Sequence, residues 1–93
     1  MFLEIVTPEA ILFSSEVDSL TVPGINGDFQ MLNNHAPVVS VLKEGTIQIE
    51  ASNASIDEKF EDKFSKSADG KMIFTINSGV LELNDNKAII LAD

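Results

Sequence analysis

The sequence predicts an all-β protein: a sandwich of about eight to ten short strands, with a short helix or helical turn inserted around residues 56–66. Two observations predict this class. Short apolar runs recur along the chain, and turn signals rich in Gly, Asn and Pro separate them at regular spacing. The strands also do not alternate with long helical stretches, as they do in α/β proteins. The 93 residues correspond to one domain, residues 1–93.

The first half of the chain contains five strand-like segments. Val38–Leu42 is almost continuously apolar, which predicts a strand buried on both faces. Thr46–Glu50 alternates, which places Ile47 and Ile49 inward. The five segments are Phe2–Val6, Glu16–Val22, Phe29–Leu32, Val38–Leu42 and Thr46–Glu50.

The segment Glu16–Val22 needs a local irregularity to fit a strand. Its three apolar residues, Val17, Leu20 and Val22, do not share one alternation phase. A slip near Asp18-Ser19 would turn all three inward, so we predict a β-bulge there. Asn26-Gly27 then predicts a tight turn before the next strand.

Residues 51–71 differ from the rest of the chain. Ser55-Ile56-Asp57-Glu58 matches a capping box, with Ser at the cap and Glu three residues later. Apolar residues recur every four positions, on what would be one face of a helix: Ile56, Phe60 and Phe64. This pattern predicts a short helix over about residues 56–66.

A second interpretation of the same region stays open. Lys63–Lys66 can be a strand, in which case Ser67–Gly70 is the turn of a hairpin that leads into Met72–Ile76. Both interpretations continue into the same closing strands, Met72–Ile76, Val80–Leu83 and Lys87–Leu91, joined by turns at Asn77–Gly79 and Asn84-Asp85-Asn86.

The charge balance restricts the possible partners. Fifteen acidic residues stand against six lysines, giving a net charge of −9. Nucleic-acid binding requires Lys and Arg to displace counterions from phosphates, so this class is excluded, and docking on anionic lipid is equally disfavoured. A basic protein partner would be attracted.

The chain has no cysteine, which excludes disulfides, Cys-ligated zinc and thiol catalysis and favours a cytoplasmic setting. No signal peptide is visible, and the longest apolar runs are too short to span a membrane. We therefore expect no direct insertion into lipid.

Catalytic chemistry finds little support in the residues. His35 is the only histidine, and the sequence lacks the nucleophile motif that a Ser-His-Asp hydrolase would need beside it. The carboxylates of 57–62 are interleaved with lysines and lack calcium-loop spacing. Gly24–Gly27 lacks the Lys-Ser/Thr ending of a phosphate loop. We expect no catalytic residue, no metal site, no nucleotide site and no cofactor.

The segment from Gly27 to Pro37 mixes apolar and polar residues, and two interpretations of it remain open. Phe29, Met31 and Leu32 could be core residues of a short strand. Some of them could instead form an exposed apolar patch, which would mark a binding surface.

Several short motifs occur together and in a fixed order. They are Val6-Thr7-Pro8-Glu9, Leu12-Phe13, Val22-Pro23-Gly24, Gly27-Asp28-Phe29, His35-Ala36-Pro37-Val38-Val39-Ser40, Gly45-Thr46-Ile47 with Ile49, Ser78-Gly79-Val80-Leu81-Glu82 and Leu91-Ala92-Asp93. Each is weak alone, but in this order they resemble the epsilon subunit of F-type ATP synthases. The resemblance covers the chain apart from residues 51–71.

Three departures from the family pattern matter. Asn33-Asn34 stands where the family usually has Pro-Gly, although Asn tolerates a left-handed turn. Residues 51–71 are longer than the usual hairpin. The chain stops at Asp93, whereas typical relatives continue into a C-terminal helical hairpin that restrains ATP hydrolysis and sometimes binds ATP. Neither activity is carried over, and we expect a natural short form or a fragment.

The resemblance implies a non-catalytic rotor component of the central stalk. In the family, a sandwich of about ten strands binds the gamma subunit and rests on the c-ring, and so helps to couple proton translocation to ATP synthesis. We expect one copy in a complex peripheral to the cytoplasmic face of the bacterial membrane. The alternatives are a free-standing β-sandwich adaptor of another assembly and a carbohydrate-binding module, although the chain lacks the Trp and Tyr that usually stack on sugars.

The resemblance also assigns two sets of contact residues. Asp28, Phe29 and Gln30 match the family loop that meets the c-ring, whose own loops commonly carry an Arg. Thr7, His35 and Ser40 match positions on the side that faces gamma.

Overall fold

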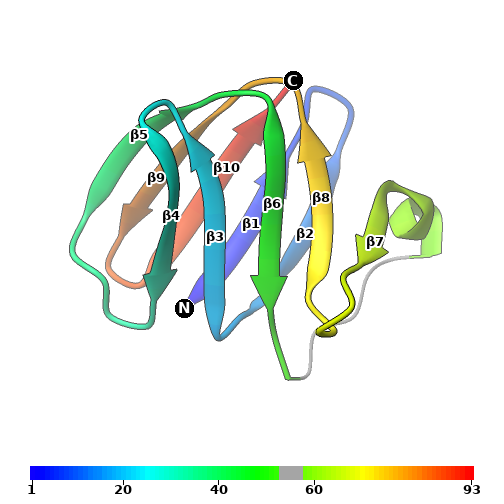
Figure 1. The fold of residues 1–93 in the computed structure, drawn as a ribbon, viewed down its shortest axis with the longest axis horizontal. Coiled ribbons are helices and arrows are strands. Elements are labelled where there is room, and N and C mark those ends of the chain that lie inside the picture. The colour runs from blue at the N-terminus through cyan, green and yellow to red at the C-terminus, as the bar shows by residue number, and fades with distance from the viewer. Residues whose placement is uncertain (53–57) are drawn as a thin grey trace.

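The computed structural model describes residues 1–52 and 58–93, which form ten strands and one short 3-10 helix (Figure 1). This confirms the all-β prediction. The elements are β1 (Phe2–Val6), β2 (Ile11–Glu16), β3 (Ser19–Gly24), β4 (Gly27–Leu32), β5 (Val38–Leu42), β6 (Gly45–Glu50), η1 (Glu58–Lys63), β7 (Phe64–Lys66), β8 (Met72–Ile76), β9 (Gly79–Asn84) and β10 (Lys87–Ala92).

The strands are arranged in two layers, one in front of the other in Figure 1. The hydrogen-bonded order is β2-β1-β10-β9-β5-β3-β6-β8-β7, with β4 paired to β3. The path passes from β5 to β3 through one residue pair, Leu42 with Gly24, and the sheet folds over at this point. One layer is therefore β2-β1-β10-β9-β5, and the other is β4-β3-β6-β8-β7.

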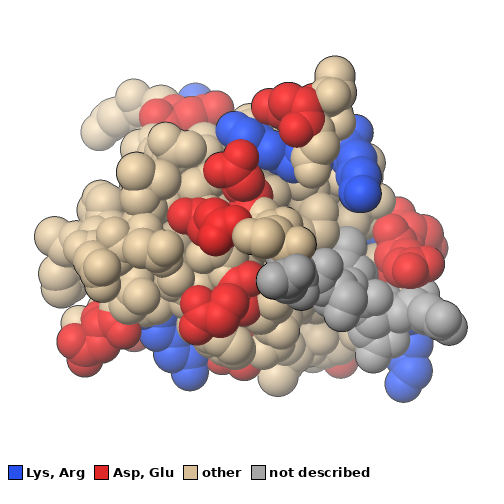
Figure 2. All heavy atoms as spheres, turned by 90° about the horizontal axis from the view of Figure 1, so that it is seen from below, with Lys and Arg blue, Asp and Glu red and all other residues tan. Residues whose placement is uncertain are grey.

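Turns gather at the two ends of the sandwich. The upper end in Figure 1 holds the β1–β2, β3–β4, β5–β6 and β8–β9 turns and the C-terminus, and the lower end holds the N-terminus and the remaining connections. Figure 2 views the lower end, where acidic atoms are spread over the middle and lysine atoms lie toward the margins.

Side chains from both layers fill one core. Ile47 and Ile49 are fully buried, as the alternation in β6 predicts, whereas Glu50 is exposed. Burying each large aliphatic side chain contributes about 1.5–3 kcal/mol. The core residues that are at most 1% exposed include Leu3, Ile5, Leu20, Val22, Met31, Leu42, Ile47, Ile49, Leu81, Leu83 and Ile90.

The expectation that Val38–Leu42 is buried on both faces is wrong. The segment is strand β5, but Val39 and Val41 are 71% and 56% exposed, whereas Leu42 is buried. Nothing among the described residues covers the outward face of this layer. All its strand pairs except β1 with β10 are antiparallel, and antiparallel sheets commonly leave one face to solvent. The continuous apolar run thus supplies both core and surface.

The predicted bulge at Asp18-Ser19 is also wrong, because Glu16–Val22 is not one strand. β2 ends at Glu16 and β3 begins at Ser19, and the chain crosses between layers in the two residues between them. The backbone N–H of Val17 donates to the Met1 carbonyl (2.8 Å), and the backbone N–H of Asp18 donates to the Glu50 carbonyl (2.7 Å). This corner changes the alternation phase, so Val17, Leu20 and Val22 are all buried as expected.

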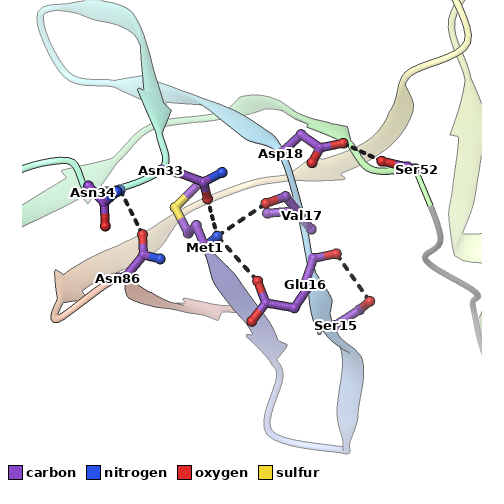
Figure 3. A network of polar contacts seen from close by, with 9 residues as sticks. All are labelled: Met1, Ser15, Glu16, Val17, Asp18, Asn33, Asn34, Ser52 and Asn86. Carbon is purple, nitrogen blue, oxygen red and sulfur yellow. Dashed lines mark hydrogen bonds and ion pairs between the residues drawn. The ribbon is translucent and has the colours of Figure 1, made fainter.

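Polar contacts hold this corner to its neighbours (Figure 3). The N-terminal ammonium group of Met1 lies 3.2 Å from Glu16 Oε2 and donates to the carbonyl of Val17 and to Asn33 Oδ1. Nearby, the Ser52 hydroxyl donates to Asp18 Oδ2 (2.8 Å). The lower end is therefore held together by links between β1, the β2–β3 corner and the loop after β4.

The region 51–71 combines the two interpretations offered above. The helix is a single 3-10 segment that ends at Lys63, and residues 53–57, with most of the capping box, lie outside the described residues. Strand β7 follows, pairs with β8 and turns at Ser67–Gly70, which confirms the hairpin. In this turn the Ser67 hydroxyl donates to Asp69, and this hydrogen bond lowers the pKa of the Asp69 carboxyl.

The β7 hairpin brings an aromatic side chain to the side of the sandwich where the sheet path ends. The Phe64 ring centroid lies 6.0 Å from that of Phe13 on β2 and 5.1 Å from that of Phe74 on β8. Phe13 and Phe74 belong to different layers, so Phe64 joins the two layers opposite the Gly24–Leu42 pair.

We expect Phe64→Ala to lower the free energy of unfolding by about 1–3 kcal/mol, because it removes two aromatic contacts and opens a gap between the layers. Phe64→Leu should restore most of the loss, and Ser65→Ala, at an exposed position of the same strand, should change little. Urea denaturation followed by circular dichroism measures this. Equal stability of Phe64→Ala and Ser65→Ala would show that the hairpin does not join the layers.

Candidate functional site

The residues matched to the c-ring loop lie at the start of β4. A two-residue turn, Ile25-Asn26, joins β3 to β4, and Gly24 pairs with Gly27 across it. Asp28 and Gln30 are exposed, and Phe29 is half-buried. A Cβ atom at Gly24 would lie 2.8 Å from the ring of Phe29, so only glycine allows the ring to pack this closely.

The two interpretations of the segment from Gly27 to Pro37 each hold in part. Met31 is fully buried in the core, whereas Leu32 is 55% exposed. Asn34 has φ of 64°, the left-handed conformation expected where the family usually has Pro-Gly. Its N–H donates to Asn86 Oδ1 (2.8 Å; Figure 3), which ties this turn to the β9–β10 turn.

A groove lies between the β3–β4 hairpin and β5. It encloses about 550 Å³, and its lining includes Asp28 and Phe29 on one side and Ser40 on the other. Three exposed aliphatic side chains, Ile25, Val39 and Val41, also line it. Members of the two predicted contact sets therefore meet in one groove.

Thr7 lies in the β1–β2 turn, where its hydroxyl group serves the turn itself. Thr7 Oγ1 accepts from the N–H of Glu9 (3.4 Å) and of Ala10 (3.3 Å), and it also lies in donating distance of the Ala10 carbonyl (3.3 Å). Thr7 therefore stabilises the β1–β2 turn at the upper end of the sandwich.

His35 lies at the opposite end, in the loop between β4 and β5. The side chain is exposed, and its Nδ1 atom lies 2.7 Å from the Ala36 carbonyl. The backbone N–H of His35 donates to the Leu32 carbonyl (3.2 Å). Ser40 is half-buried within β5 and donates to the Val41 carbonyl (3.3 Å). Thr7, His35 and Ser40 thus do not form one cluster.

The outward face of the layer β2-β1-β10-β9-β5 carries a feature that sequence reasoning missed. Aliphatic residues on five neighbouring strands pair in register, so that their side chains cross the sheet near its upper end. We call this set the aliphatic row: Val41 on β5, Val80 on β9, Leu91 on β10, Val6 on β1 and Ile11 on β2.

Most of the aliphatic row is open to solvent. Val41, Leu91 and Ile11 are 54–56% exposed, Val80 is 39% exposed and Val6 is half-buried. Because neighbouring strands lie about 4.8 Å apart, five strands give a row about 19 Å long. An exposed, contiguous apolar band of this kind marks an interaction surface.

The row lies close to one of the predicted contact residues, Thr7, which directly follows Val6. Ser40 directly precedes Val41, but alternation turns its side chain to the opposite face of β5, where it pairs with the buried Leu81. Single strands gave no signal of the row, since it exists only once the five strands are in register. The alternation within β9 and β10 was the one clue in the sequence.

Two further features were sought among the described residues, a metal-ligand cluster and a membrane-spanning helix. Within residues 1–52 and 58–93, no group of three His, Asp or Glu side chains is arranged to hold a metal ion. Over the same residues, no helix has the length and apolar character required to cross a bilayer.

Comparisons with known proteins identify the family of the domain. Residues 1–93 match the family described as the β-sandwich domain of the ATP synthase delta/epsilon chain. The chain is 37% identical over 91 residues to the ATP synthase epsilon chain of Chlorobaculum tepidum, covering 98% of this chain and 86% of that protein. It is 39% identical to the epsilon chain of Campylobacter curvus, covering 100% of this chain but 60% of the relative.

Solved structures share the fold. One chain in the central stalk and c-ring structure of Tetrahymena thermophila mitochondrial ATP synthase matches with a TM-score of 0.72 at 17% identity, covering 99% of this chain and 62% of that one. A chain of the Euglena gracilis mitochondrial ATP synthase also matches with a TM-score of 0.72, at 20% identity, covering 97% of this chain and 48% of that one.

Proposed function

This chain belongs to the family of ATP synthase delta/epsilon β-sandwich domains, and from that membership we propose that it is a non-catalytic central-stalk subunit that binds gamma and the c-ring. Its role is to join shaft and ring into one rotating body, so that proton translocation is coupled to ATP synthesis. It does so from a position peripheral to the cytoplasmic face of the bacterial membrane.

The aliphatic row carries the proposal for gamma. A layer whose inner face already fills the core has no further use for exposed aliphatic side chains at Val41, Val80 and Leu91. Covering them with a partner removes apolar surface from water, worth about 25 cal/mol per Å² before the costs of association. Thr7, a position that the family resemblance assigns to the gamma side, directly follows Val6 in the row.

The β3–β4 hairpin supports the proposal for the c-ring. Asp28 and Gln30 are exposed near the upper end, and Phe29 packs behind them against Gly24. A carboxylate held there can accept charge-assisted hydrogen bonds from an Arg in a ring loop. Because the hairpin also borders the groove next to Ser40, the two contacts are close enough for shaft and ring to meet across this subunit.

We expect Val80→Asp to weaken binding to purified gamma subunit at least about tenfold, because it places a charge within the covered row, between Val41 and Leu91. Thr75→Asp adds the same charge at an exposed position of β8 in the other layer, and should bind as the unmodified protein does. Isothermal titration calorimetry measures both affinities. Equal binding by the two variants would show that gamma does not bind the aliphatic row.

We expect Asp28→Lys to lower proton pumping by the reassembled ATP synthase, because like charges would then meet at the ring. Exposed ion pairs are worth under about 1 kcal/mol, so the loss should be several-fold rather than complete. Asp62→Lys, with the same charge change on η1, is the matched control. Fluorescence quenching of a pH-sensitive dye in vesicles reports pumping, and unchanged pumping by Asp28→Lys would make Asp28 an ordinary solvated residue.

The substitutions His35→Ala and Ser40→Ala should each weaken gamma binding by roughly two- to tenfold, which corresponds to the net free energy of one hydrogen bond. Surface plasmon resonance with immobilised gamma gives the dissociation rates. Circular dichroism should show the same fold in both variants. If both retain full affinity while Val80→Asp loses it, gamma contacts the row but neither of these side chains.

A further inference from the structure

Glu82 is a charged residue on the outward face, next to the aliphatic row. It lies on β9, two residues after Val80, and its side chain is exposed. Its partners on the two neighbouring strands are Val39 on β5 and Ile89 on β10. The carboxylate therefore borders the aliphatic row, with apolar side chains on both sides.

No ion pair formed within residues 1–52 and 58–93 includes Glu82. The lysine on the adjacent strand, Lys87, is turned toward β1 instead. Its Nζ atom lies 3.6 Å from Glu4 Oε1 and 5.9 Å from the centre of the Phe2 ring. Glu4 thus has its cation supplied by this chain, and Glu82 does not.

A hollow of about 320 Å³ lies beside Glu82. Its lining combines apolar groups with two polar side chains, the Glu82 carboxylate and the Asn84 amide: Pro37, Val38, Val39, Glu82, Leu83 and Asn84. Such a lining suits a long basic side chain, because the methylene groups of Lys or Arg can pack on Pro37 and Val39 while the head group reaches the carboxylate.

Energetics favours a cation at this position once the face is covered. A partner seated on the aliphatic row also removes water from Glu82, and burying an unpaired carboxylate is costly. A Lys or Arg from the partner offsets that cost, and the net charge of −9 already attracts a basic surface. We infer that the hollow beside Glu82 receives a Lys or Arg side chain of the gamma subunit, and this inference rests on the function proposed above.

The test compares two variants that lose the same charge, Glu82→Gln and Glu61→Gln, the latter at an exposed position of η1. Their affinities for purified gamma are measured by calorimetry at low and high salt. We expect Glu82→Gln to weaken binding about tenfold or more and to reduce its salt dependence, as the loss of one partner of a desolvated pair does. Glu61→Gln should change the affinity less than about twofold, because an exposed charge far from the interface contributes little to the binding free energy.

Charge reversal at Glu82 gives a second, independent test. Glu82→Lys should abolish measurable binding, and a Lys→Glu or Arg→Glu substitution in gamma should restore it when it changes the residue that enters the hollow. Circular dichroism of each variant excludes unfolding. Equal affinity of Glu82→Gln and Glu61→Gln, together with weak binding by Val80→Asp, would overturn the Glu82 inference and leave the gamma contact standing. Unaffected binding by Val80→Asp would overturn the contact itself.

Discussion

The alternation of side chains along β5 sets both the interior and the surface of this molecule. Its last residue, Leu42, is buried and pairs with Gly24, the one pair through which the sheet path passes from one layer to the other. Alternation then forces Val39 and Val41 outward, where nothing in the described chain covers them. The seam between the layers and the exposed apolar face are consequences of the same five residues.

Sequence reasoning succeeded where one strand contains its own signal. The alternation in β6 and the turn residues Asn26-Gly27 and Asn84–Asn86 gave the right elements, because pleating and positive φ are local properties. Strand β2 was missed, since Ile11, Leu12 and Phe13 do not alternate. The predicted bulge was wrong because a crossing between layers is a tertiary event that a local pattern does not contain. The predicted short helix is present as η1, but it ends at Lys63 because β7 pairs with β8.

The same distinction applies to the candidate site. Asp28, Phe29 and Gln30 lie on an exposed hairpin, which motif order alone could indicate. The aliphatic row could not be predicted, because its members come from five strands and meet only through register. The position of Glu82 between Val39 and Ile89 depends on register in the same way. The half-buried position of Ser40 likewise follows from its place opposite Leu81, a fully buried residue.

The β7 hairpin has a consequence for the protein before it meets any partner. Without it, β8 would present five residues of unpaired backbone at the border of its layer, a template on which another chain can add a strand. β7 occupies that position with only three residues, the last of them Lys66. A short, charged border is a poor template for aggregation, so this border of the layer resists the addition of a strand from another molecule.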